Sequence, residues 1–210
     1  MVNQEMFKSK RINTLTLSTV CLLLTLFQNS CQTNAPSKRI TIASSGKVNS
    51  LDPARANTLK ALQLISSLGD TLYELDNDGE LIPKLASKMP VISKDKLKIS
   101  ISLKKNILFH DGTPFDSKAM KFTIERFQRI GTNNYILDKK IKSIETPNKN
   151  SLIINLNKPA SSLEGLLTSV NLTAISPSFY KNHIDKFLNN NFVGTGQYLS
   201  LIHISEPTRL

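Results

Sequence analysis

The segment Leu97–Lys104 restricts the fold more than any other part of the sequence, because apolar and polar residues alternate strictly along it. A two-residue period places the apolar side chains on one face of a β-strand and the polar ones on the other. We therefore predict a strand with one buried and one solvated face. Asn106 follows it, and Asn tolerates a left-handed backbone better than most residues other than Gly. The chain can turn there and return as a second strand over Ile107–Phe109.

Other segments predict helices and further strands. Lys60–Leu72 and the stretch after Asp116 carry apolar residues at the spacing of an amphipathic helix. Asp116 or Ser117 can cap the second helix by accepting hydrogen bonds from its free N–H groups. The remaining ordered segments are expected to be strands at Arg39–Ala43, Ile141–Glu145 and Leu152–Leu156, a helix or packed turn at Ser162–Val170, and a Gly-rich, then β-like, run at Phe192–Tyr198. Strands and helices interleave, so the fold class is α/β or α+β.

The first 31 residues have the layout of a secretory signal. A basic patch at Lys8–Arg11 precedes the 13-residue apolar stretch Leu15–Phe27, and small or polar residues follow it. The stretch is shorter than the about 20 residues that a membrane-spanning helix needs. We expect residues 1–31 to be a signal peptide that ends in a lipoprotein-type cysteine, and residues 32–38 to form a short tether.

Cys31 stands where a bacterial lipoprotein carries its acylated cysteine, and the region resembles a lipobox. Ser30 suits the position before such a cysteine, whereas Gln28 stands where an aliphatic residue is usual. We expect Cys31 to be lipidated, which would anchor the protein to a membrane through buried acyl CH₂ groups worth about 0.8 kcal/mol each. The alternative is an ordinary signal peptide, cut nearby, that leaves a free thiol.

The formal net charge of the chain is +11. Its Lys residues are scattered singly and in pairs such as Lys104–Lys105, and only 6% of the residues are aromatic. Nucleic-acid-binding proteins concentrate their cations on one face, so we interpret the charge as a solvated surface and expect no nucleic-acid partner. Glu125–Arg126 is interpreted as a solvated or packed pair. The alternative, a basic nucleic-acid-binding lipoprotein, would bind in a strongly salt-dependent manner.

We find no residue pattern that indicates catalysis or a resident metal. His110–Asp111 has no nucleophile nearby in the sequence, and Gly194–Gly196 lacks the Gly-Lys-Ser/Thr that completes a phosphate-binding loop. His110 and His183 are not at a ligand-like spacing, and no Cys follows Cys31. We therefore expect no catalytic residue, no metal site and no cofactor. The alternative in a different class is a fragment of a secreted hydrolase.

Several segments recur together in order between about residues 40 and 198. They are Leu51–Ala54, Tyr73–Glu74, Asp78–Glu80, Pro83–Ala86, Leu103–Phe115 (LKKNILFHDGTPF), the helical residues Phe122, Glu125 and Arg126, Leu156–Pro159 and Val193–Gly196 with Tyr198. This set resembles family 5 of the bacterial extracellular solute-binding proteins, which supply peptide, nickel and related ABC importers. Three positions depart from the family pattern, with Met89 in place of Trp, Asn106 in place of Gly and Gln197 in place of Pro.

The resemblance implies a periplasmic-binding-protein-like fold of type II, in which two lobes close around a solute by a hinge motion. Residues 39–198 would form the N-terminal part of the family domain. They would comprise part of lobe I (39–74 and 165–198) and a small inserted domain (75–164), with the second lobe absent. Residues 199–210 instead read as a translated sequencing adaptor, and we expect them to be an artefact.

The resemblance also implies a function. We expect the substrate-binding component of an ABC importer, which binds peptides or a related small solute outside the cytoplasmic membrane and delivers them to permease and ATPase subunits. Ala56, Asn57 and Thr58 match the family's loop at the lobe interface, where backbone groups can pair with an extended peptide. The alternative for Asn57 is that it only caps the next helix. The alternative solutes are nickel, another metal chelate or a sugar.

The lipidation of Cys31 can be tested on the mature protein. Mass spectrometry of its N-terminus should find Cys31 as the first residue, carrying acyl chains, because the thiol is acylated before the leader is removed. A Cys31→Ala variant should lack the added mass. An unmodified Cys31 in the mature wild-type protein would contradict the prediction.

Overall fold

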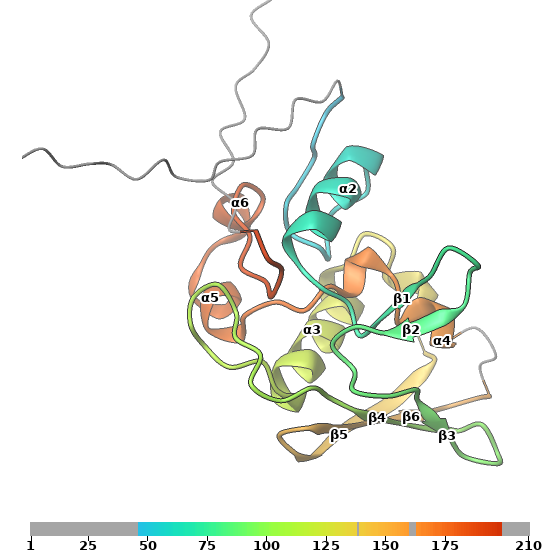
Figure 1. Ribbon diagram of the computed structural model, residues 1–210. Helices are drawn as coiled ribbons and strands as arrows, with labels where there is room; N and C mark the ends of the chain where they lie inside the picture. The colour runs from blue at the N-terminus through green and yellow to red at the C-terminus, as the bar shows by residue number, and fades with distance from the viewer. Residues whose placement is uncertain (1–45, 138, 160–162, 199–210) are drawn as a thin grey trace, which may run out of the picture. The chain divides into compact units, whose positions relative to one another are not determined.

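The structure is a computed structural model and describes residues 46–137, 139–159 and 163–198. The signal segment with Cys31, the tether, the strand expected at Arg39–Ala43 and the expected adaptor segment 199–210 all lie outside the described residues. Figure 1 shows how the described helices and strands are arranged.

Helices and strands interleave along the described chain, as the sequence predicts. The α-helices are α2 (Leu59–Leu68), α3 (Ser117–Ile130), α4 (Leu163–Leu166), α5 (Pro177–Asn182) and α6 (Asp185–Leu188), and 3₁₀ turns cover Asn134–Ile136 and Val170–Leu172. The strands are β1 (Tyr73–Leu75), β2 (Leu81–Pro83), β3 (Val91–Ile92), β4 (Lys98–Ser102), β5 (Ile141–Asn148) and β6 (Ser151–Leu156). They form a β1–β2 hairpin and a four-stranded antiparallel sheet in the order β3-β4-β6-β5.

Strand β4 has the alternation that the sequence predicts. Ile99 and Ile101 are buried, whereas Lys98 is exposed. Across the sheet Ile99 pairs with Ile154 of β6, and Ile101 pairs with Leu152. All four apolar side chains are almost fully buried, so neighbouring strands place their apolar residues on the same face of the sheet.

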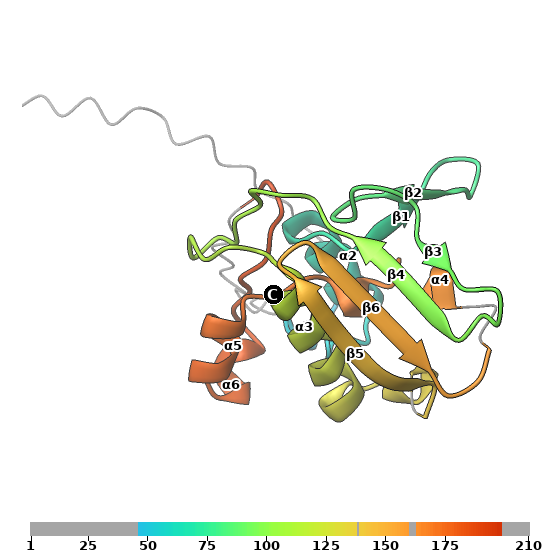
Figure 2. The same ribbon diagram turned by 90° about the horizontal axis from the view of Figure 1, so that it is seen from below.

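Helix α3 covers one face of this sheet and lies directly behind it in Figure 2. The predicted cap is confirmed, because the Asp116 carboxylate accepts a hydrogen bond of 2.9 Å from the N–H of Ala119. The predicted apolar side is confirmed as well, since Met120, Ile124 and Phe127 are buried in the cluster that also holds the sheet residues. Burial of each such side chain stabilises the fold by about 1.5–3 kcal/mol.

A second hydrophobic cluster joins α2 to the segment around α5 and α6. Its buried members include Leu51, Ala61, Ile65, Leu68, Ile175, Tyr180, Leu188 and Phe192. The helix predicted at Lys60–Leu72 is confirmed in type, but it begins one residue earlier and ends at Leu68. It ends there because the extended Gly69 leaves the helix while its N–H still bonds to the carbonyl of Ile65.

The second strand expected at Ile107–Phe109 does not form beside β4. The partners of β4 are β3 and β6, and a single bridge from Leu108 to Pro114 closes a short turn instead. Phe109 is buried in the sheet cluster and makes an edge-on contact with Phe115. Asn106 adopts a positive φ of 59°, so the prediction of a left-handed turn residue is confirmed.

The Gly-rich run predicted to become β-like at Phe192–Tyr198 is not a strand in the structure. It packs closely against the end of α2, where the Gly196 N–H donates to the carbonyl of Leu68 at 3.1 Å. A Cβ atom at Gly196 would overlap the backbone of Leu68 and Gly69. This close approach of two backbones, rather than strand pairing, explains why Gly stands at position 196.

Gly196→Ala should therefore destabilise the protein by about 1–3 kcal/mol, the usual cost of overpacking, because the clash is with backbone that cannot rotate away. Urea unfolding at neutral pH would measure the loss. Gly165→Ala is the matched control, since a Cβ there meets no other atom within 4 Å and Ala favours the helix by at most about 1 kcal/mol. Equal stability of the two variants would refute the argument.

Candidate functional site

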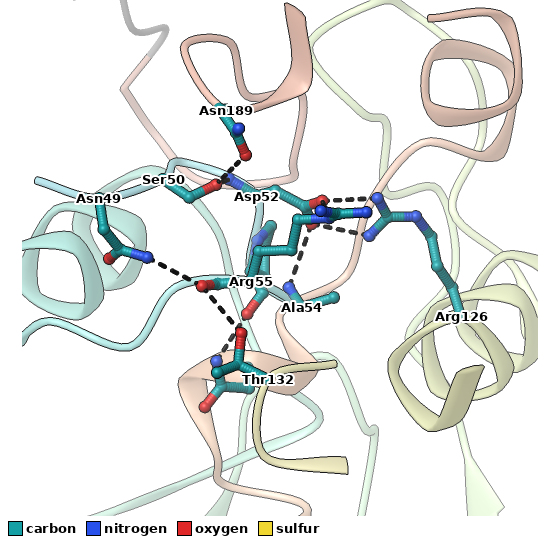
Figure 3. Close-up of polar contacts among 10 residues, drawn as sticks. Asn49, Ser50, Asp52, Ala54, Arg55, Arg126, Thr132 and Asn189 are labelled. Atoms are coloured by element: carbon teal, nitrogen blue, oxygen red, sulfur yellow. Dashed lines mark hydrogen bonds and ion pairs between the residues drawn. The ribbon is translucent and has the colours of Figure 1, made fainter. Parts of the chain in front are cut away.

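The loop that carries the predicted ligand residues is held by a buried ion pair. The guanidinium of Arg126 in α3 donates to both carboxylate oxygens of Asp52, at 2.7 Å from Nη1 and 2.5 Å from Nη2. Asp52 is completely buried and Arg126 is only 4% exposed. Figure 3 shows this two-pronged contact. Charge-assisted bonds of this geometry are among the strongest in proteins, so the pair fixes the loop against α3.

The Asp52 carboxylate also organises its own loop. Its Oδ1 accepts the N–H of Ala54 at 3.1 Å, and its backbone N–H bonds to the Ser50 hydroxyl at 3.0 Å. The Ser50 hydroxyl in turn donates to the side chain of Asn189 at 2.7 Å. Figure 3 shows that these contacts come from both sides of the loop. The loop therefore has its conformation specified by groups from distant parts of the chain.

The carbonyls of the loop are bonded as completely as its amides. The Asn171 side chain donates to the carbonyls of Pro53 and Ala56 at 2.6 and 2.9 Å. Thr132 donates its N–H to the carbonyl of Ala54 and its hydroxyl to the carbonyl of Arg55. The backbone of Pro53–Ala56 is consequently satisfied inside the protein, which favours a rigid loop.

The predicted ligand residues Ala56, Asn57 and Thr58 lie where this loop enters α2. Ala56 is fully buried, and both its N–H and its carbonyl are bonded within the chain. Thr58, rather than Asn57, caps the helix, because its Oγ1 accepts the N–H of Ala61 at 3.3 Å. The N–H groups of Asn57 and Thr58 both bond to the side chain of Asn49 at 3.2 Å. The exposed Asn57 side chain is therefore the polar group that this stretch presents to solvent.

A second polar junction lies at the turn that begins with His110. His110 Nε2 lies 2.7 Å from the carbonyl of Gly196, and its Nδ1 accepts the Gly194 N–H at 3.4 Å. This pairing requires the ring hydrogen on Nε2. Asp111 accepts hydrogen bonds from Ser176 and Ser178. His110 thus joins the turn to the Gly194–Gly196 segment, and Asp111 joins it to Ser176 and Ser178.

The charge of Asp111 is supported by its surroundings. Burial acts to raise the pKa of its carboxyl, but hydrogen bonds from Ser176 and Thr113 outweigh that effect and hold the pKa below its usual value. The side chain is mostly accessible to solvent, so solvent screening keeps this contribution to stability small. Asp111 is therefore a carboxylate at neutral pH, with its oxygens already engaged.

Two further features bear on the kind of site the chain offers. Among the described residues, no group of three or more His, Cys, Asp or Glu side chains lies close enough together to hold a metal ion. None of the helices in the described part of the chain is both long enough and apolar enough to cross a bilayer.

The family follows from a comparison with known protein families. The model of the bacterial extracellular solute-binding proteins, family 5 Middle, matches residues 80–200, and the chain belongs to this family. Among curated proteins, it is 29% identical over 163 residues to the glutathione-binding protein GsiB of Escherichia coli O1:K1, covering 77% of this chain and 31% of GsiB. The chain thus spans about a third of the length of the curated relatives it matches.

Solved structures show the same fold. The match with OppA of Listeria monocytogenes, which was solved bound to peptide, covers 73% of this chain and 34% of the OppA chain. The TM-score is 0.67 and the sequence identity is 21%. The match with NikZ of Campylobacter jejuni, which was solved in complex with Ni(L-His), covers 73% of this chain and 31% of the NikZ chain. The TM-score is 0.63 and the sequence identity is 28%. The predicted mixed α/β fold of the type II periplasmic binding proteins is confirmed.

Sequence reasoning missed most of the residues that hold the loop. Asn171, Thr132 and Asn189 lie between 77 and 139 positions from their loop partners, so no local pattern reveals them. Arg126 was noted beside Glu125, but it pairs with Asp52, while Glu125 contacts Lys121 at 3.6 Å. The available signal was the resemblance itself, because Arg126 and the segment Leu51–Ala54, which contains Asp52, both belong to the set that recurs in order.

Asp52→Asn should lower the free energy of unfolding by about 3–5 kcal/mol, because it leaves a buried guanidinium without its counter-charge. Urea unfolding followed by circular dichroism would measure the change. The matched control is Glu74→Gln, which removes the 3.2 Å pair with Lys84. Both of those side chains are more than 40% exposed, so the control should cost less than about 1 kcal/mol. A similar loss in both variants would show that the buried pair does not anchor the loop.

Proposed function

We propose that the protein is the substrate-binding component of an ABC importer, which binds a peptide or a related small solute and passes it to the permease and ATPase subunits. The observation that carries the proposal is the family match over residues 80–200. Two of the relatives, GsiB and OppA of Listeria monocytogenes, are named for glutathione and for bound peptide, and glutathione is itself a short peptide. These two relatives support a peptide-like solute.

The proposed mechanism is capture by lobe closure, with no catalytic step. In this mechanism, the loop before α2 already has its binding conformation before the solute arrives. Less conformational entropy is therefore lost on binding. The backbone of Ala56 is already bonded internally, and the Thr58 hydroxyl is engaged with Asn49 and Ala61, so we assign the contact with the solute to the side chain of Asn57. An amide side chain both donates and accepts, which suits the peptide groups of many sequences.

The division into parts is also proposed. We assign residues 39–74 and 165–198 to lobe I and 75–164 to the small inserted domain. The four-stranded sheet and α3 fall within 75–164, and α2, α5 and α6 fall outside it. Tyr73 and Leu167 belong to the same hydrophobic cluster as the sheet, so the boundary is a packed interface rather than a linker.

We further propose that the protein works outside the cytoplasmic membrane and is held there by lipid on Cys31. The family is one of extracellular binding proteins, and the basic-apolar-cysteine layout of the first 31 residues supports export and anchoring. The alternative solute is a nickel chelate, because NikZ was solved with Ni(L-His) and is 28% identical to this chain.

Calorimetric titration of the protein, expressed from its complete natural reading frame, with glutathione, a set of tripeptides and Ni(L-His) would test the proposal. We expect saturable binding of at least one peptide. Asn57→Ala should weaken that binding by up to about tenfold, the effect of one lost hydrogen bond of roughly 1 kcal/mol.

Asn77→Ala is the matched control, because Asn77 is an equally exposed Asn in the turn between β1 and β2. It should leave peptide affinity unchanged. Binding of Ni(L-His) alone would favour the nickel alternative. Absence of binding to any of the solutes would contradict the proposed function. Equal peptide affinities of the Asn57→Ala and Asn77→Ala variants would contradict the role of Asn57.

A further inference from the structure

A pocket of about 350 Å³ opens between α3 and the segment that carries α5 and α6. The α3 side contributes Phe122, Arg126, Arg129 and Ile130, and the other side contributes Tyr180, Lys181, His183 and Leu188, with Arg55 from the loop. None of Ala56, Asn57 and Thr58 lines it. The pocket is therefore separate from the residues assigned to the transported solute.

The pocket has a strong excess of positive charge. Among the residues that the structure describes, its lining includes three Arg and one Lys but no Asp or Glu. The carboxylate of Asp52 is completely buried and accepts hydrogen bonds from both Nη atoms of the lining residue Arg126. The Arg55 Nε lies 3.7 Å from the same carboxylate. Both oxygens of Asp52 accept hydrogen bonds from Arg126, so this carboxylate is engaged there and not with Arg129 or Lys181.

Aromatic rings, rather than carboxylates, support two of these cations. The Lys181 Nζ lies 5.3 Å from the centre of the Phe122 ring, and the Arg126 guanidinium lies 5.0 Å from the centre of the Tyr180 ring. A ring face attracts a cation without neutralising its charge. The aromatic rings therefore hold these side chains in place but leave their positive charge able to attract an anion. Ile130 and Leu188 add apolar surface beside them.

Tyr180 adds a neutral donor to the same wall. Burial, and then the charge of Asp52, raise the pKa of its hydroxyl well above the usual value, and Arg126 opposes them only in part. The hydroxyl is therefore protonated at every physiological pH. It lies near the backbone of Val193 but makes no hydrogen bond of normal geometry with the described residues.

We propose that this pocket binds the anionic group of a small molecule, a carboxylate or a phosphate, through Arg129 and Lys181. Concave sites of one charge sign concentrate ligands of the opposite sign. The planar fork of Arg donates two parallel hydrogen bonds to carboxylate or phosphate oxygens. The apolar residues at the wall would receive the carbon skeleton that carries the anionic group.

The test uses the full chain and two probes, succinate and inorganic phosphate, each titrated at constant ionic strength and followed by amide chemical shifts. We expect saturable shifts around α3 and α5 with at least one probe. Arg129→Gln and Lys181→Gln should each weaken that binding about tenfold or more. Both side chains are exposed, so the folded state should survive both changes, and melting temperatures would verify this.

Lys142→Gln is the matched control, because it removes the same charge from an exposed position on β5, away from the lining residues. It should leave the affinity unchanged. Saturation by succinate alone would assign the site to carboxylates, and saturation by phosphate alone would assign it to phosphates. Shifts that never saturate, or that weaken equally in Lys142→Gln, would show a general charge effect and overturn the proposal.

Discussion

The ion pair between Asp52 and Arg126 is the contact on which the rest of this structure depends. It joins residues that are 74 positions apart, and it connects the loop before α2 to the helix that covers the sheet. Moving two charges out of water is costly, and the cost is offset only when the remaining hydrogen-bonding groups are satisfied. The N–H of Ala54 and the nearby guanidinium of Arg55 supply that compensation around the carboxylate.

The second junction, at His110 and Asp111, is different in kind. It uses neutral or exposed groups, and it binds the turn before α3 to Ser176 and the Gly194–Gly196 segment. The two junctions hold the small sheet and its helix against the remaining helices at separate places. Together with the shared hydrophobic cluster, they leave little freedom between these parts. The described residues are therefore held together at two junctions and by one shared cluster, and the loop before α2 has its backbone bonded within them.

In the structure, the basic residues fall into two groups, one dispersed over the surface and one gathered at a pocket. Most Lys residues are dispersed, which agrees with the interpretation of a solvated surface. Arg55, Arg129 and Lys181 are the exception, since they converge on one pocket from three separate segments. The pocket and the loop share the buried ion pair as their common support, because Asp52 shapes the loop while Arg126 forms part of the pocket wall. An anion in the pocket would therefore bind next to the group that holds the loop before α2 in place.

The sequence by itself determined several local elements and indicated the family. Strict alternation in β4, the capped apolar pattern of α3 and the left-handed turn at Asn106 are short-range properties, so they could be recognised without coordinates. The strand partners of β4, the close approach at Gly196 and the convergence of the basic residues depend on segments far apart in the chain. No local pattern encodes them, because they arise only when burial of the apolar faces brings those segments together.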